Sequence, residues 1–74
     1  MNQCRMILEH LREHGSITQL EALNQYGIMR LASRINDIKK HGADIRKENI
    51  YYLRDGAKKH YAKYFLVEDM NHEP

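Results

Sequence analysis

A chain of 74 residues is long enough for one domain with a small hydrophobic core, so we expect a stability of only a few kcal/mol. This length leaves no room for a catalytic cleft, and a single cysteine excludes an intramolecular disulfide. The first residues, MNQCRM, lack a hydrophobic signal core, and no apolar run approaches the length of a membrane span. We therefore expect a cytoplasmic protein that is no enzyme, needs no cofactor and does not contact a membrane.

The spacing of apolar residues predicts a first helix near the start of the chain. Cys4, Ile7, Leu8 and Leu11 stand at positions i, i+3, i+4 and i+7, which place them on one face of a helix. Gly15 is expected to end this helix. On its apolar face, Cys4 is expected to be a small buried hydrophobe rather than a reactive thiol.

A capping box marks the start of a second helix. Thr18 is followed three residues later by Glu21, so each side chain can bind the backbone N–H of the other residue. The helix is expected to begin at Thr18 and to end near Gln25, before a left-handed turn at Gly27. Its apolar face is expected to consist of Leu20, Ala22 and Leu23.

A third helix is predicted over residues 28–40, after a turn of about three or four residues. At about 100° per residue, its apolar and polar side chains separate into two opposite arcs. The apolar arc is expected to contain Ile28, Leu31, Ala32, Ile35 and Ile38. The opposite arc contains Met29, Arg30, Ser33, Arg34, Asp37 and Lys40. One face is therefore predicted to pack in the core while the other stays free for a partner.

Two capped helices joined by a glycine turn are typical of a helix-turn-helix, whose second helix reads bases in the major groove of DNA. On the predicted helix 28–40, Arg30 and Arg34 are placed for bidentate contacts to guanine. Ser33 can donate to a base or phosphate, and Met29 can contact a thymine methyl group. Asp37 is expected to orient the two arginines. A solvated charged face would explain the same residues without DNA.

After Gly42 the composition changes to aromatic and β-branched runs, over residues 43–54 and 59–67. Asp55-Gly56 lies between the runs as a turn signal, and we expect a turn of more than two residues. The prediction is an α+β fold of three helices followed by a two-stranded hairpin, the wing, over residues 43–67. Ser16-Ile17 is a candidate for a short strand beside it.

Positive charge is concentrated in the second half of this fold. The whole chain carries only +2, but residues 28–63 hold ten basic and four acidic side chains. Such an asymmetry is typical of a nucleic-acid binder. The side chains expected on the DNA backbone are Thr18, Lys40, Arg54, Lys58 and Lys59. Polar hairpin tips also occur for solubility and edge protection alone.

Several motifs support a family resemblance. GSIT-x-LEA, YGI and RLASRI-x-DI-K, followed by AKYFL, closely resemble the small winged helix-turn-helix proteins of bacteriophages and prophages. The resemblance covers most of the chain, but no shared motif stands between Ile45 and Lys59. It implies double-stranded DNA binding by a regulator or an excisionase-like recombination accessory protein. It also places Arg30, Ser33 and Arg34 on the recognition helix.

The motif His10-Leu11-Arg12-Glu13-His14 matches H-x-x-E-H, a zinc-protease signature. Five-residue patterns recur by chance, and the predicted helix stops one residue later. We therefore expect His10 and His14 to lie on the surface, with no metal site. His41 is expected to favour the C-terminus of the third helix or to meet a phosphate.

Other readings remain open. The fold can serve protein partners instead of DNA, through a surface of Met29, Tyr51, Tyr52, Tyr61 and Tyr64. Stacking of single-stranded RNA bases on Tyr51 or Tyr52 is a third possibility. We expect a domain over residues 1–67 and an acidic, disordered tail over 68–74, which offers no dimerising helix. The protein is expected to be a monomer that binds DNA together with further copies on adjacent sites.

Overall fold

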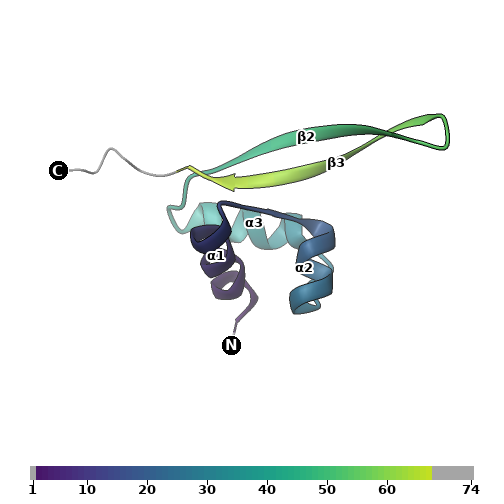
Figure 1. Cartoon of the computed structure of the whole chain (residues 1–74). Helices are drawn as coiled ribbons and strands as arrows, with labels where there is room; N and C mark the ends of the chain where they lie inside the picture. Colours follow the sequence, from purple (N-terminus) through teal and green to yellow (C-terminus); the bar gives the residue numbers. More distant parts are fainter. Residues whose placement is uncertain (1, 68–74) are drawn as a thin grey trace.

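The computed structural model describes residues 2–67, in which three helices pack on one side of an antiparallel sheet (Figure 1). The elements are α1 (Gln3–His14), β1 (Ser16–Thr18), α2 (Gln19–Tyr26), α3 (Leu31–Lys40), β2 (Ile45–Arg54) and β3 (Ala57–Leu66). The strand order is β1-β3-β2. The predicted α+β fold is confirmed, but the sheet has three strands rather than the two of the wing, because Ser16–Thr18 joins it.

The start of α2 is confirmed by both hydrogen bonds of the capping box. The Glu21 backbone N–H donates to Thr18 Oγ1 at 3.2 Å, and the Thr18 backbone N–H donates to Glu21 Oε1 at 3.0 Å. Thr18 is therefore the last residue of β1 and the N-cap of α2. One side chain fixes the angle at which the strand leads into the helix.

The turn between α2 and α3 is longer than the apolar pattern indicated. Gly27 adopts a left-handed conformation, with φ of 70°, and its N–H donates to the Leu23 carbonyl at 2.9 Å. The Gly27 bond is that of an αL cap, and Ile28 N–H also donates to the Ala22 carbonyl at 3.1 Å, so both N–H groups that follow α2 are bound by its carbonyls. The predicted helix start at residue 28 is therefore wrong, and α3 begins at Leu31. Ile28 fitted the helical pattern because it is fully buried, although it lies in the turn.

The core lies among the helices and the base of the sheet. Its fully buried residues are Ile7, Leu11, Ile17, Ala22, Ile28, Leu31, Ile35, Ile38 and Ile45. The half-buried Cys4, Leu8, Tyr26, Ala43, Tyr64 and Leu66 pack around them. Every element therefore contributes to a single small core.

Three residues predicted on apolar core faces lie outside. Leu20 and Leu23 of α2 are 66% and 43% exposed, and Ala32 of α3 is also exposed. The helix α2 has only eight residues, and Ala22 is its buried side chain. Ala32 lies about 100° around the helix axis from Leu31, beyond the core-facing arc. These predictions were wrong because apolar character alone does not tell which side of a short helix is covered.

The hairpin turn is tighter than predicted. Only Asp55 and Gly56 separate the strands, and Arg54 pairs with Ala57. Asp55 has φ of 52° and Gly56 has φ of 77°, the two left-handed residues of a type I′ hairpin turn. The expected longer turn and the strand start at Lys59 are therefore wrong, because pairing continues through the polar residues Lys58 and Lys59.

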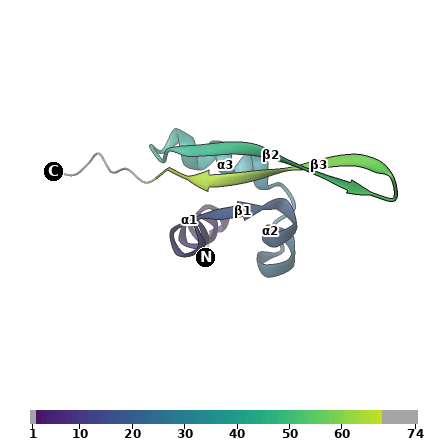
Figure 2. The same cartoon turned by 45° about the horizontal axis from the view of Figure 1, so that its top comes forward.

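The hairpin projects beyond the helices. The strand β1 pairs only with Lys63–Phe65, near the base of β3, whereas β2 and β3 pair over their whole lengths. Figures 1 and 2 show the two strands running past α2, and the molecule measures 49 × 28 × 20 Å along its principal axes. Within residues 2–67, the outer half of the hairpin is thus a two-stranded ribbon that pairs with no third strand.

Candidate nucleic-acid interface

The outer surface of α3 and of the turn before it is polar and exposed. Arg30 is the N-cap of α3, and Met29 before it is 74% exposed. Within the helix, the exposed side chains are Ala32, Asn36, Lys39 and Lys40. This arrangement leaves one side of α3 free to enter a groove of the width that B-DNA offers in its major groove.

The beginning of α3 is held by a side chain from α2. Gln19 Oε1 accepts a hydrogen bond from the Leu31 backbone N–H at 2.9 Å, and Gln19 Nε2 donates to the Ile28 carbonyl at 2.7 Å. Arg30, the N-cap, makes no side-chain cap of its own. The amide of Gln19 therefore replaces that cap and ties the two helices across the turn.

Two of the predicted base-reading residues are less free than the others. Ser33 and Arg34 are half-buried, and Cys4 Sγ in α1 lies 3.9 Å from the Arg34 carbonyl oxygen. Arg34 Nη2 also lies 3.4 Å from Asp37 Oδ2. Of the two arginines that Asp37 was expected to orient, it pairs with Arg34, and no ion pair with Arg30 is present within residues 2–67. The four predicted residues therefore divide into an open pair, Met29 and Arg30, and a partly covered pair.

Sequence reasoning missed Asn36. It is exposed on the outer side of α3, between the exposed residues Ala32 and Lys40 one turn away on either side. An Asn amide can pair with adenine N6 and N7 in the major groove. The angular position of Asn36 on the helix could have indicated its exposure. The predicted polar arc did not include Asn36, because that arc was centred on the arginines.

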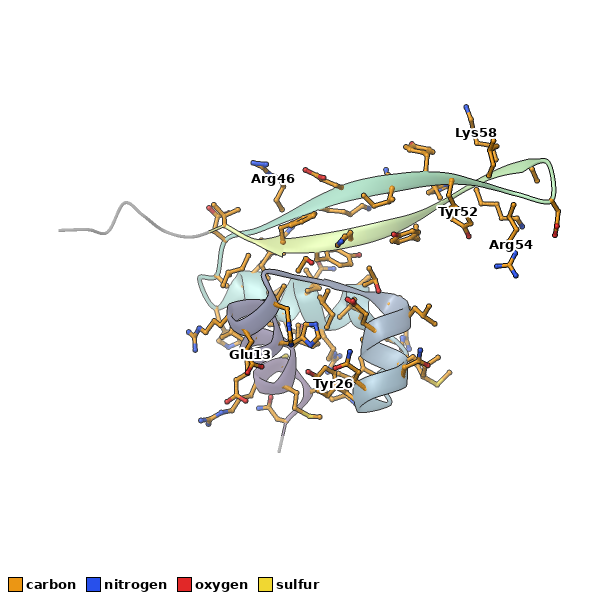
Figure 3. The ribbon with its side chains drawn as sticks, viewed as in Figure 1. Glu13, Tyr26, Arg46, Tyr52, Arg54 and Lys58 are labelled. Carbon is orange, nitrogen blue, oxygen red and sulfur yellow. The ribbon has the colours of Figure 1, made fainter. Side chains whose placement is uncertain are left out.

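The wing carries exposed cations around its tip. Arg54, Lys58 and Lys59 are all exposed, as predicted for contacts to a phosphate backbone. Figure 3 shows Arg54 pointing toward the side of the helices and Lys58 pointing away from them. The tip therefore presents positive charge on both of its faces.

The hairpin turns over along its length. Arg46, Tyr52 and Arg54 stand at even spacing on β2, so they would share one face of a flat strand. In Figure 3, Arg46 points away from the helices, whereas Tyr52 and Arg54 point toward them. Two-stranded ribbons twist strongly. Because of this twist, the face of the hairpin that points to solvent near its base points toward the helices near its tip.

A groove lies between this inner side of the ribbon and the start of α2 and α3. Its polar wall includes Thr18, Gln19 and Arg54. Its apolar lining includes Leu20, Leu23, Ala32, Ile50, Tyr52 and Tyr61. Tyr52 and Tyr61 are diagonal neighbours on the two strands, with ring centroids 5.9 Å apart.

The first histidine of the H-x-x-E-H motif makes a structural contact between two helices. His10 is only 3% exposed, and its Nδ1 lies 2.7 Å from Tyr26 Oη on α2. The expectation that His10 lies on the surface is therefore wrong, because α2 packs over that side of α1. Glu13 and His14 point to solvent, with side chains 78% and 58% exposed. Residues 2–67 contain no group of three side chains that could hold a metal ion.

His41 caps the end of α3. Its backbone N–H donates to the Ile38 carbonyl at 3.1 Å, the following Gly42 N–H donates to the Lys39 carbonyl at 3.0 Å, and His41 Nδ1 lies 2.8 Å from the Asp37 carbonyl oxygen. Of the two roles expected for His41, the contact with the helix C-terminus is therefore present.

A helix-turn-helix followed by a β-hairpin, with β1 closing the sheet, defines the class of this protein. The chain matches the winged helix-turn-helix domain family over residues 2–69 and belongs to that family. Searches of curated proteins and of solved structures give no significant match. Domains of this family are typically DNA-binding modules without catalytic activity. Within residues 2–67, no helix is long and apolar enough to span a membrane.

Proposed function

We propose that this protein binds double-stranded DNA with sequence specificity, as a phage-type regulator or recombination accessory factor. The observation that supports this function best is the joint exposure of the α3 surface and of the basic wing tip. In the proposed complex, α3 and the turn before it lie in the major groove, and the wing meets the backbone or the adjacent minor groove.

The proposed base contacts come from the turn and the outer side of α3. Arg30 binds guanine O6 and N7, Met29 contacts a thymine methyl group, and Asn36 pairs with adenine. Ser33 and Arg34 remain proposed contacts nearer the edge of the surface. Because Arg34 is paired with Asp37, it reaches a base only if that ion pair opens or moves with it.

The proposed backbone contacts surround this surface. Thr18 Oγ1 accepts from Glu21 N–H, so its own hydroxyl hydrogen stays available for a phosphate oxygen. The cations proposed for phosphates are Lys40, Arg54, Lys58 and Lys59. These contacts fix the position of the protein on DNA without reading sequence.

A selection from random duplex DNA, followed by titrations with the selected site, tests the proposal. Arg30→Ala should weaken binding to that site by about 1 to 3 kcal/mol and relax the preference at one or two positions. Lys58→Ala or Lys59→Ala should instead weaken all duplexes alike and lower the salt slope by about one unit. Equal effects of these variants on every sequence would refute the assignment of α3 as the reading helix.

A second candidate function is supported by the groove beside the wing. Leu20 and Leu23 are large exposed apolar residues there, opposite Tyr52 and Tyr61. A partner protein could place an amphipathic helix in such a groove, with an acidic flank near Arg54. Affinity for DNA that falls steeply with salt favours the first function, whereas weak DNA binding at all salt concentrations favours the second.

A further inference from the structure

The residue pairs near the tip of the hairpin include large apolar residues that do not pack in the core. Beyond the part of β3 that pairs with β1, Tyr51 pairs with His60 and Leu53 pairs with Lys58. Tyr51 is 62% exposed and Leu53 is 73% exposed. Neither belongs to the core or packs against it. Within residues 2–67, these two side chains are therefore left uncovered at the tip.

Leu53 and Tyr51 form a ridge along one face of the ribbon. Residues two apart on a strand share a face, and their cross-strand partners share it with them. His60 lies beside Tyr51, with ring centroids 5.5 Å apart, and Lys58 lies opposite Leu53. Because Lys58 points away from the helices in Figure 3, the ridge lies on the outer face of the tip.

The hairpin that carries the ridge is positively charged. The two strands of the hairpin and their turn carry six cations and two carboxylates. The cations are Arg46, Lys47, Arg54, Lys58, Lys59 and Lys63. Lys58 shares the face of Leu53, whereas Arg54 and Lys59 lie on the opposite face of the tip. An apolar side chain on a positively charged ribbon matches a base step of duplex DNA, where apolar base faces lie between two rows of phosphates.

The width of the ribbon has a further consequence for the DNA. Its strands lie about 4.8 Å apart between backbone centres, and with side chains the ribbon exceeds the minor groove of B-DNA, which is about 6 Å wide. Entry of the tip therefore requires the groove to open. Unstacking one base step with an apolar wedge opens the groove and bends the duplex toward the major groove.

We infer that Leu53 is an intercalating wedge, supported by Tyr51, through which the wing kinks duplex DNA. This inference rests on the proposed DNA-binding function. Since Leu53 lies on the outer face of the tip, the kinked step falls beyond the bases that α3 contacts. The protein then acts on the shape of its site as well as reading it.

Energy transfer between dyes at the two ends of a duplex tests the wedge, with the site selected from random DNA placed at its centre. The wild type and Leu53→Met, which keeps a long apolar side chain, should shorten the end-to-end distance. Leu53→Ala should bind the duplex without shortening it. Because Leu53 is exposed and outside the core, this variant keeps the fold, which a thermal melt verifies.

A second measurement compares the intact duplex with one that carries a two-base mismatch at the kinked step. The mismatch lowers the energy needed to deform the step, so the wild type and Leu53→Met should prefer it by about ten-fold. Leu53→Ala should bind both duplexes alike. Equal bending by Leu53→Ala and the wild type would overturn the wedge while leaving DNA binding intact. Absence of duplex binding by any variant would instead overturn the proposed function itself.

Other occupants of the ridge would give different results. Loss of self-association in Leu53→Ala, with unchanged bending, would assign the ridge to a contact between copies of the chain. Preference of the wild type for a single strand over either duplex would assign Tyr51 to base stacking. Either outcome overturns the wedge.

Discussion

At the scale of single residues, Thr18 and Gln19 are neighbours that fix two successive changes of direction. Thr18 closes the capping box with Glu21 where the chain passes from β1 into α2. Gln19 reaches across the turn to hold Ile28 and the first N–H of α3. A dipeptide thus sets the position of α3 relative to the sheet and to α2.

Thr18→Ala should lower the free energy of unfolding by about 0.5 to 2 kcal/mol, because it leaves a helix N–H without its side-chain acceptor. In a domain of this size that is a large share of the total. Thermal and urea denaturation measure the change. Thr18→Ser, which keeps the hydroxyl, is the control, and unchanged stability of the alanine variant would show that the cap is dispensable.

Gln19→Ala should lower the free energy of unfolding by about 0.5 to 1.5 kcal/mol, the usual contribution of one hydrogen bond. The loss is no larger because water can replace some of the two hydrogen bonds that the amide makes. Its effect on DNA affinity should be larger than that of Gln25→Ala, an exposed glutamine on the same helix. The reason is that α3 loses the contact that fixes its start. Equal DNA affinities of the two variants, measured at matched salt, would contradict this role.

At the scale of elements, the caps and the strand pairing were accessible from sequence because their chemistry is local. Thr18 with Glu21, Gly27 and Gly15 each mark a helix end by residues within a few positions. Asp55-Gly56 likewise marked the turn, although its length was overestimated. The start of α3 and the exposure of Leu20 were not accessible, because both depend on which neighbouring elements cover a residue.

A comparison of two leucines tests whether the contribution of an apolar residue to stability depends on the elements that cover it. Leu11→Ala should cost about 2 to 5 kcal/mol, because its side chain is 1% exposed in the centre of the core. Leu20→Ala should change stability by no more than about 0.5 kcal/mol, because its side chain is 66% exposed. Urea denaturation with a common slope compares them. A large loss of stability in the Leu20 variant would contradict the exposed position of that side chain.

At the scale of the whole molecule, the candidate site combines segments far apart in sequence. The turn at Met29 and Arg30, the outer side of α3 and the wing tip all lie outside the small core that positions them. Charge asymmetry along the sequence indicated the wing and α3 together. It did not distinguish Asn36, nor the partial cover of Arg34 by α1, because those depend on how α3 is rotated in the packed structure.

We expect the free protein to be a monomer, because the apolar side of α1 is already used by the core through Ile7 and Leu11. One such module buries only about 600 to 1,000 Å2 on DNA, so strong binding requires copies on adjacent sites. Sedimentation at micromolar concentration measures the state of the free protein, and titration of duplexes with one or two sites measures cooperativity. A stable free dimer would contradict this and predict a palindromic site with half-sites about one helical turn apart.

Because the hairpin is twisted, the direction in which the side chains at its tip point depends on the length of its strands. The pairing of β2 with β3 is continuous up to the two-residue turn, so the tip has no unpaired residues outside the turn that could absorb a change in length. One more residue in each strand would move the tip outward and also rotate the side chains beside it about the ribbon axis. An insertion or deletion in the wing would thus redirect its cations and its leucine together. Small changes of hairpin length give such a domain a way to reach different nucleic-acid shapes from an unchanged core.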